Sequence, residues 1–113
     1  MKLYVINATP WRDDVQRSAN IVNMIDYPSD VAMILAEHSI EGFTMYEVQG
    51  YWQGKAERSF KIEIALEDTR ILRAITGTVS VEVLINRICT ILRDKYNQES
   101  VMLTLPNGEV EFI

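Results

Sequence analysis

The sequence predicts an α+β domain in which two helices cover one face of an antiparallel sheet. Three observations favour this class. The 113 residues are 48% hydrophobic and 24% charged, which is typical of one globular domain. Residues 59–66 alternate apolar and polar side chains, with the period of a half-buried strand. Residues 80–96 repeat apolar side chains with the period of a helix.

The N-terminal part begins with a predicted strand. Residues 3–7 are rich in β-branched and aromatic side chains, and the strand is expected to end at residues 8–10. The next segment allows two interpretations. It forms either a helix from Asp13 to about Met24 or an irregular segment with a short strand at residues 21–25.

Tyr27-Pro28 is predicted to end whichever element precedes it, because the backbone conformation of a helix is disfavoured for the residue before a proline. Ser29 is a good N-cap for a helix over residues 30–38. Gly42 then allows the chain to turn.

The central part predicts an antiparallel hairpin. Residues 43–49 form its first strand and residues 59–66 its second, with a longish connection over residues 50–58. Residues 67–78 are expected to form a short helix or an irregular connector. The strongest predicted helix, residues 80–96, follows.

The C-terminal part predicts a strand, a turn at Pro106-Asn107-Gly108 and a last strand. The complete order is β-α-β-β-α-β with an extra C-terminal strand. This order is that of a ferredoxin-like, split βαβ domain, which we expect to span residues 1–113. The uncovered sheet face predicts self-association into a dimer or trimer.

Charge and composition exclude several function classes. A net charge of −5 argues against general nucleic-acid binding, because phosphate contacts need a cationic face. The single Cys89 forms no internal disulfide, and no Cys/His set predicts a zinc site. No signal peptide or membrane span is visible, so a cytoplasmic protein is expected.

Catalytic signatures are absent from the sequence. His38 is the only histidine, and it is interpreted as a packed or helix-capping residue. Paired carboxylates could serve acid/base chemistry or bind Mg²⁺, and the candidates are Asp13, Asp14, Glu41, Glu47 and Glu63. Nothing in the sequence fixes their spacing across the fold, so they are interpreted as solvated acids. The sequence therefore predicts a protein that is not an enzyme and uses no cofactor or metal.

The candidate ligand-binding residues lie around the predicted connection. They combine large aromatic side chains with amide and cationic groups, which suit a planar or anionic ligand: Gln49, Gly50, Tyr51, Trp52, Gln53, Lys55 and Arg58. Trp11 and Arg12 form a second aromatic and cationic pair. We expect the two groups to be adjacent across a subunit boundary, because one subunit need not bring them together.

Parts of this sequence resemble two known groups of proteins. The segment Gly42-Phe43-Thr44-Met45-Tyr46-Glu47-Val48-Gln49-Gly50 resembles a pattern of the PII-like signalling proteins. That resemblance implies a trimer whose inter-subunit clefts bind adenine nucleotides or similar anions. The chain is also similar to small uncharacterised bacterial proteins with G-x-T…Q-G-x-W and Q-E-S-V motifs, the latter at Gln98-Glu99-Ser100-Val101.

These observations favour a non-catalytic, oligomeric protein that binds a small anionic or nucleotide-like ligand for regulation or sequestration. The alternative is a small acidic protein that inhibits a basic partner, as phage- or plasmid-encoded inhibitors do.

Overall fold

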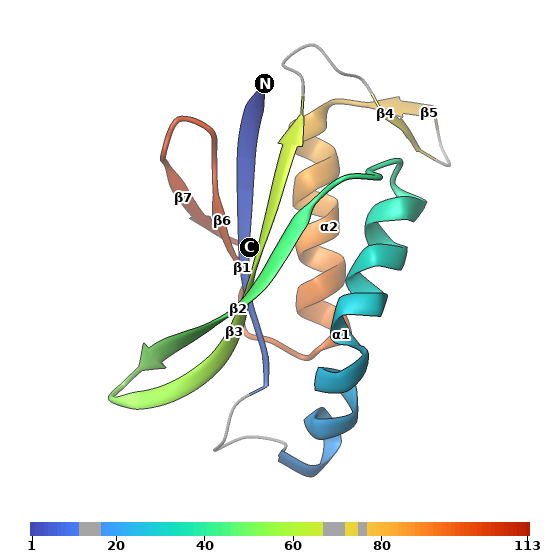
Figure 1. Ribbon diagram of the computed structural model, residues 1–113. Coiled ribbons are helices and arrows are strands. Elements are labelled where there is room, and N and C mark those ends of the chain that lie inside the picture. The colour runs from blue at the N-terminus through green and yellow to red at the C-terminus, as the bar shows by residue number, and fades with distance from the viewer. Residues whose placement is uncertain (12–16, 67–71, 75–76) are drawn as a thin grey trace.

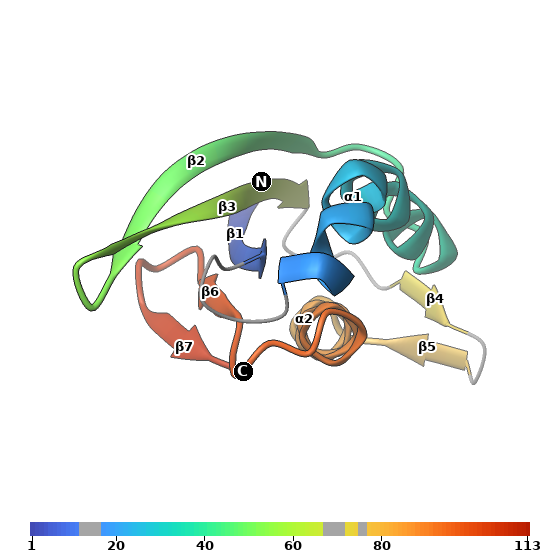
Figure 2. The ribbon, with the colours of Figure 1, turned by 90° about the horizontal axis from the view of Figure 1, so that it is seen from below.

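The computed structural model is a curved antiparallel sheet with two helices packed on one of its faces (Figures 1 and 2). The structure describes all residues except 12–16, 67–71 and 75–76. For residues 10–11, 17–26, 52, 72–74 and 77–79 it describes the backbone only.

The main sheet has five strands, all paired antiparallel, in the order β2-β3-β1-β6-β7. The strands are β1 (Lys2–Trp11), β2 (Thr44–Trp52), β3 (Lys55–Leu66), β6 (Met102–Thr104) and β7 (Val110–Phe112). The predicted α+β class is therefore confirmed, and so is the pairing of the two central strands. Both of these strands are longer than the sequence indicated.

Helix α2 (Val81–Lys95) matches its predicted range. Ser80 caps its N-terminus, where the Ser80 hydroxyl accepts a hydrogen bond from the backbone N–H of Val83 at 3.4 Å. Glu82 lies in the first turn, where the helix dipole favours an acid. The apolar stripe of α2 is buried against the sheet as predicted.

Helix α1 (Arg17–Glu37) corrects the prediction of a break at Tyr27-Pro28. The helix continues through Pro28, and Ser29 lies inside it instead of capping a shorter helix. Tyr27 and Val31 are both fully buried in this stretch. Continuing the helix keeps both in the core, and we attribute its passage through the proline to that burial.

Strand β1 also runs further than predicted, because it continues past residues 8–10 to Trp11. Its register with β3 shifts between Ala8 and Trp11. Pro10 lies within this irregular stretch, and bulges are among the few places where a sheet accepts a proline.

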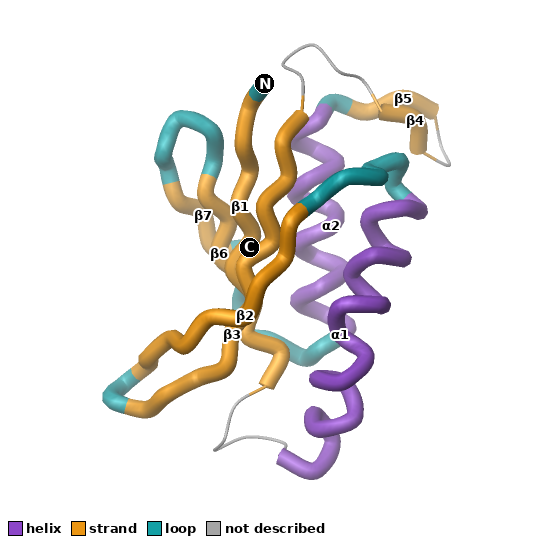
Figure 3. The backbone as a smooth tube through the Cα atoms, viewed as in Figure 1, coloured by secondary structure: helices purple, strands orange, loops and turns teal. Residues whose placement is uncertain are grey.

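Two short strands replace part of the connector predicted over residues 67–78. They are β4 (Leu72–Ala74) and β5 (Gly77–Val79), and they form a separate two-stranded sheet (Figure 3). The rest of that predicted connector lies outside the described residues.

The C-terminal hairpin has the predicted turn. The Gly108 N–H donates to the Leu105 carbonyl at 2.9 Å, and Gly108 adopts a φ of 91°. Positive φ is readily available to glycine, so Pro106-Asn107-Gly108 forms a three-residue loop with the glycine in its left-handed position.

An aromatic cluster centred on Tyr27 lies between α1, α2 and β3. The Tyr27 ring stacks on Phe60 with centroids 5.0 Å apart and meets the edge of Tyr96 at 4.7 Å. The Tyr96 hydroxyl donates to Asp30 Oδ2 at 2.6 Å. Within the described part of the chain the buried Tyr27 hydroxyl has no hydrogen-bond partner, and its burial raises the pKa of the phenol.

Replacing Pro28 by Ala should stabilise the protein, because alanine restores a backbone donor and removes the proline ring from a helix interior. We expect the free energy of unfolding in urea to rise by roughly 1–3 kcal/mol. Ser29→Ala is the matched control, and it should change stability by less than about 0.5 kcal/mol. A loss near 1 kcal/mol in Ser29→Ala would instead indicate an N-cap at Ser29 and a helix that starts there.

Replacing Tyr27 by Phe should also stabilise the protein, because it removes a buried hydroxyl that has no partner and keeps the ring contacts. The expected gain in the free energy of unfolding is about 1 kcal/mol. Tyr96→Phe is the control, and it should lose about 1–2 kcal/mol with its hydrogen bond to Asp30. Equal losses in both variants would contradict the unpaired state of Tyr27.

Candidate functional site

The candidate site lies on the sheet face that α1 and α2 leave uncovered (Figure 2). Side chains alternate between the two faces of a strand. The apolar side chains of β3 from Phe60 to Leu66 alternate into the core. The open face therefore carries the intervening residues of β3 and their cross-strand neighbours: Asn7, Thr9, Tyr46, Val48, Gly50, Glu57, Ser59, Lys61 and Glu63.

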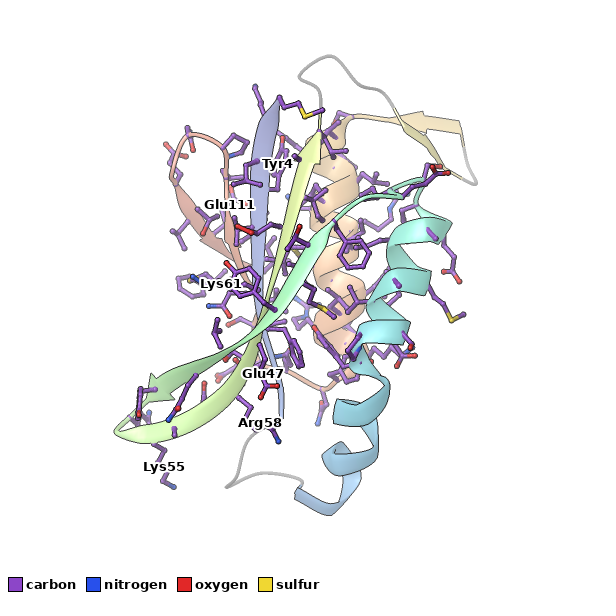
Figure 4. All side chains as sticks on the ribbon, in the orientation of Figure 1. Tyr4, Glu47, Lys55, Arg58, Lys61 and Glu111 are labelled. Atoms are coloured by element: carbon purple, nitrogen blue, oxygen red, sulfur yellow. The ribbon has the colours of Figure 1, made fainter. Side chains whose placement is uncertain are left out.

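The hairpin of β2 and β3 corrects the predicted connection over residues 50–58. The strands remain paired up to Trp52 and Lys55, and only Gln53 and Gly54 form the turn. Their φ values are 52° and 78°, as a two-residue type I′ turn requires. Figure 1 shows this hairpin extending away from the helices, and Figure 4 places Lys55 near its tip.

The predicted binding residues are divided between the two faces of this hairpin. Gln49 and Tyr51 share one face with Arg58, and the Gln49 Nε2 donates to the Tyr51 hydroxyl at 2.9 Å. Gly50 belongs to the opposite, open face, as does position 52 by register; the side chain of Trp52 is not described. The sequence-based set therefore does not form one surface.

Arg58 is engaged by an acid of its own hairpin. Its Nε donates to Glu47 Oε1 at 2.8 Å, and both side chains are about half exposed. Such an exposed pair contributes under about 1 kcal/mol to stability. In the single chain Arg58 is therefore a largely solvated arginine paired with Glu47.

Trp11 lies closer to the hairpin than the sequence suggested. Its Cα is the register partner of Arg58, which is in turn the partner of Gln49 on β2. These positions are aligned across three strands of one chain, so no subunit boundary is needed to bring them together. Arg12 lies outside the described residues.

A polar cluster occupies the middle of the open face. Lys61 lies between Asn7 of β1 and Tyr46 of β2 in the strand register. Glu63 follows on the same face of β3, and both Lys61 and Glu63 are half-buried. The Asn7 Oδ1 is buried and has no hydrogen-bond partner among the described residues.

A hydroxyl pair continues the polar cluster toward the hairpin tip. Thr9 Oγ1 and Ser59 Oγ lie 2.9 Å apart in a hydrogen bond, and Ser59 is only 4% exposed. The next residue on this face is Glu57, whose register partner is Gly50. Because glycine has no side chain, the register position opposite Glu57 on β2 carries none.

Apolar side chains frame this polar cluster. Large hydrophobic residues are exposed on the same face along three strands, and they are Leu3, Tyr46, Val110 and Phe112. Phe112 of the edge strand β7 is the most exposed, at 72%. Exposed apolar patches of this kind mark ligand-binding or protein-binding surfaces.

Two further titratable groups among the described residues, His38 and Cys89, belong to the packed part of the molecule. The His38 ring Nδ1 is 2.6 Å from the Ile34 carbonyl near the end of α1, which confirms a packed histidine. Cys89 is buried, and this burial raises the pKa of its thiol to about 12. Among the described residues no three His, Cys, Asp or Glu side chains are grouped to hold a metal ion, and no helix is long and apolar enough to cross a membrane.

Tyr46, Glu57 and Lys61 were not predicted as site residues from the sequence. The alternation of residues 59–66 already placed Lys61 and Glu63 on one face, and that signal was available. Glu57 was assigned to a loop, so its place on a strand next to Gly50 was not foreseen.

Comparisons with known proteins show which fold this is. No family model matches the sequence, and no curated protein matches it. Among solved structures, a phage SAM lyase in complex with S-methyl-5′-thioadenosine has a TM-score of 0.66 at 19% identity, over 98% of this chain and 87% of that one. A phage SAM lyase in the apo state has a TM-score of 0.68 at 20% identity, over 98% of this chain and 86% of that one.

This comparison corrects the predicted function. The protein was expected to be a non-catalytic binder of an anionic ligand, yet the structures that share its fold along nearly the whole chain are those of a lyase. The prediction that it is not an enzyme is therefore contradicted. The alternative, a small acidic inhibitor, does not match an enzyme either. The resemblance to PII-like proteins stays a prediction.

Proposed function

We propose that this chain is a lyase that cleaves S-adenosylmethionine and releases S-methyl-5′-thioadenosine. The observation that carries the proposal is the shared fold, at TM-scores of 0.66 and 0.68, combined with an open sheet face that bears acids and an exposed tyrosine. The proposed substrate is a cation at sulfur, which suits an acidic chain of net charge −5.

The chemistry places clear demands on the site. The bond between the sulfonium sulfur and the γ-carbon of the amino-acid part breaks, and its electron pair remains on sulfur. The thioadenosine product is then a neutral thioether. In a lyase reaction water is not a reactant, so the γ-carbon must form a new bond within its own four-carbon fragment. Either the carboxylate of the fragment attacks the γ-carbon and closes a lactone, or the β-carbon loses a proton and a double bond forms between the β- and γ-carbons.

Glu57 and Tyr46 are the residues that we assign to the sulfonium end. The Glu57 carboxylate faces a position without a side chain, and there it would hold the substrate's positive charge and accept a proton if one is lost. The Tyr46 ring, 40% exposed on the same face, offers a surface for the cation. Tyr46 is the register partner of Lys61. Lys61 follows Glu57 by four residues on β3, so these two positions are about 13 Å apart along the strand.

A single sheet face does not enclose a small molecule. We propose that a second copy of the chain covers it, because Leu3, Val110 and Phe112 are exposed on this face beside the polar cluster. Burying them between copies would exclude water from the site and stabilise the assembly. The hairpin tip with Gln53 and Lys55 would then form a wall of the pocket, which retains the tip residues predicted from the sequence.

We also propose that the fold is a ferredoxin-like domain with additions. The order β2-β3-β1-β6 with one helix after β1 and one before β6 supports this classification. The additions are β7 at the edge and the separate β4–β5 hairpin.

Purified protein incubated with S-adenosylmethionine should release S-methyl-5′-thioadenosine, which chromatography with ultraviolet detection measures directly. Glu57→Gln should lower the rate about 100-fold, because it removes a charge that stabilises the reacting cation. Glu109→Gln is the matched control; this exposed acid lies in the C-terminal turn, so the rate should stay unchanged. Absence of the product with the unmodified chain would overturn the proposal.

Phe112→Asp should reduce the subunit number seen by native mass spectrometry, because a charge on the open face opposes burial between copies. Val83→Asp is the matched control; Val83 is 52% exposed on α2, away from the open face, and this variant should keep the assembly. A single-subunit particle for the unmodified protein at micromolar concentration would contradict the proposed covering copy.

A further inference from the structure

We infer that Lys61 and Glu63 bind the amino-acid end of the substrate, with Lys61 on its carboxylate and Glu63 on its ammonium group. This inference rests on the proposed function and adds to it the residues that distinguish substrate from product.

Lys61 and Glu63 lie next to each other on the open face of β3. Lys61 lies on β3, with β2 on one side and β1 on the other, and Figure 4 shows it far from Lys55 at the hairpin tip. Glu63 comes two residues later on the same face, so the two Cα atoms are about 7 Å apart. Its register partners are Val5 and Thr44, which carry no charge.

Both charges are unpaired within the described residues. Neither Lys61 nor Glu63 forms an ion pair or a side-chain hydrogen bond anywhere in the part of the chain that the structure describes. By contrast, Arg58 and Glu47 on the other face of the same hairpin are paired at 2.8 Å. Half-buried charges are normally compensated, because desolvation disfavours an isolated ion.

The amino-acid end of the proposed substrate matches the charges of this pair. An α-amino acid carries a carboxylate and an ammonium group on one carbon, and together they complement an ammonium and a carboxylate placed side by side. Lysine and glutamate side chains are long enough to converge on such a group from positions 61 and 63. The buried Asn7 Oδ1 beside Lys61 adds an acceptor that lacks a donor.

This arrangement would separate substrate from product. S-methyl-5′-thioadenosine has no amino-acid end, so it loses every contact with Lys61 and Glu63 once the carbon–sulfur bond breaks. The pair would thus strengthen substrate binding without slowing release of the nucleoside.

Isothermal titration with two non-reacting probes tests the inference. S-adenosylhomocysteine carries the amino-acid end but no sulfonium, and S-methyl-5′-thioadenosine carries neither. Lys61→Met and Glu63→Gln should each weaken S-adenosylhomocysteine binding at least 10-fold and change S-methyl-5′-thioadenosine binding less than 2-fold. Lys61→Arg, which keeps the cation, should restore part of the lost affinity. Lys2→Met, on the other face of β1, is the control and should affect neither probe.

The outcomes separate this inference from the proposed function. If the unmodified protein binds both probes but Lys61→Met weakens both equally or neither, only the role of the pair is overturned. If the unmodified protein binds neither probe and releases no thioadenosine from S-adenosylmethionine, both proposals fail. Circular dichroism of each variant establishes that its fold is retained.

Discussion

The antiparallel pairing of β3 with β1 and β2 determines where every candidate functional side chain lies. The register is continuous from Lys2 opposite Leu66 to Ala8 opposite Phe60. A slip of one residue would turn Lys61 and Glu63 into the core and move Ile62 and Ile64 to the open face. The hydrophobic demand of the core therefore also orients the charged residues of the site.

This arrangement separates stability from chemistry. The helices, the Tyr27 cluster and the inward side chains of the sheet supply the buried apolar surface. The open face contributes little to that core, so it can carry Tyr46, Glu57 and Lys61. Burying the polar groups of these residues in the core would lower the free energy of unfolding. Changes on one face should thus be largely independent of changes on the other.

The sequence predicted the elements whose periodicity is strong. Helix α2, the alternation in β3 and the turn at Pro106–Gly108 follow from local patterns and match the structure. Helix α1 was divided at Pro28, because local proline chemistry opposes a continuous helix and the burial of Tyr27 and Val31, which we take to favour it, is a tertiary effect.

The site was predicted less well, for a related reason. The aromatic and cationic residues near the hairpin tip were singled out by type, but their distribution over two faces depends on the exact turn at Gln53-Gly54. The neighbours of Lys61 come from β1 and β2, and the β1 pairing joins residues far apart in the chain. No local pattern reports such a pairing, so Asn7 and Tyr46 were not associated with Lys61.

The buried cysteine has a practical consequence for following this molecule by spectroscopy. Cys89 is closed to solvent, and burial raises the pKa of its thiol to about 12, so little reactive thiolate is present near neutral pH. A cysteine introduced at Gln53 would therefore be the site that a maleimide dye labels in the native protein. Because position 53 is at the end of the extended hairpin, such a dye would report the approach of another molecule to the tip.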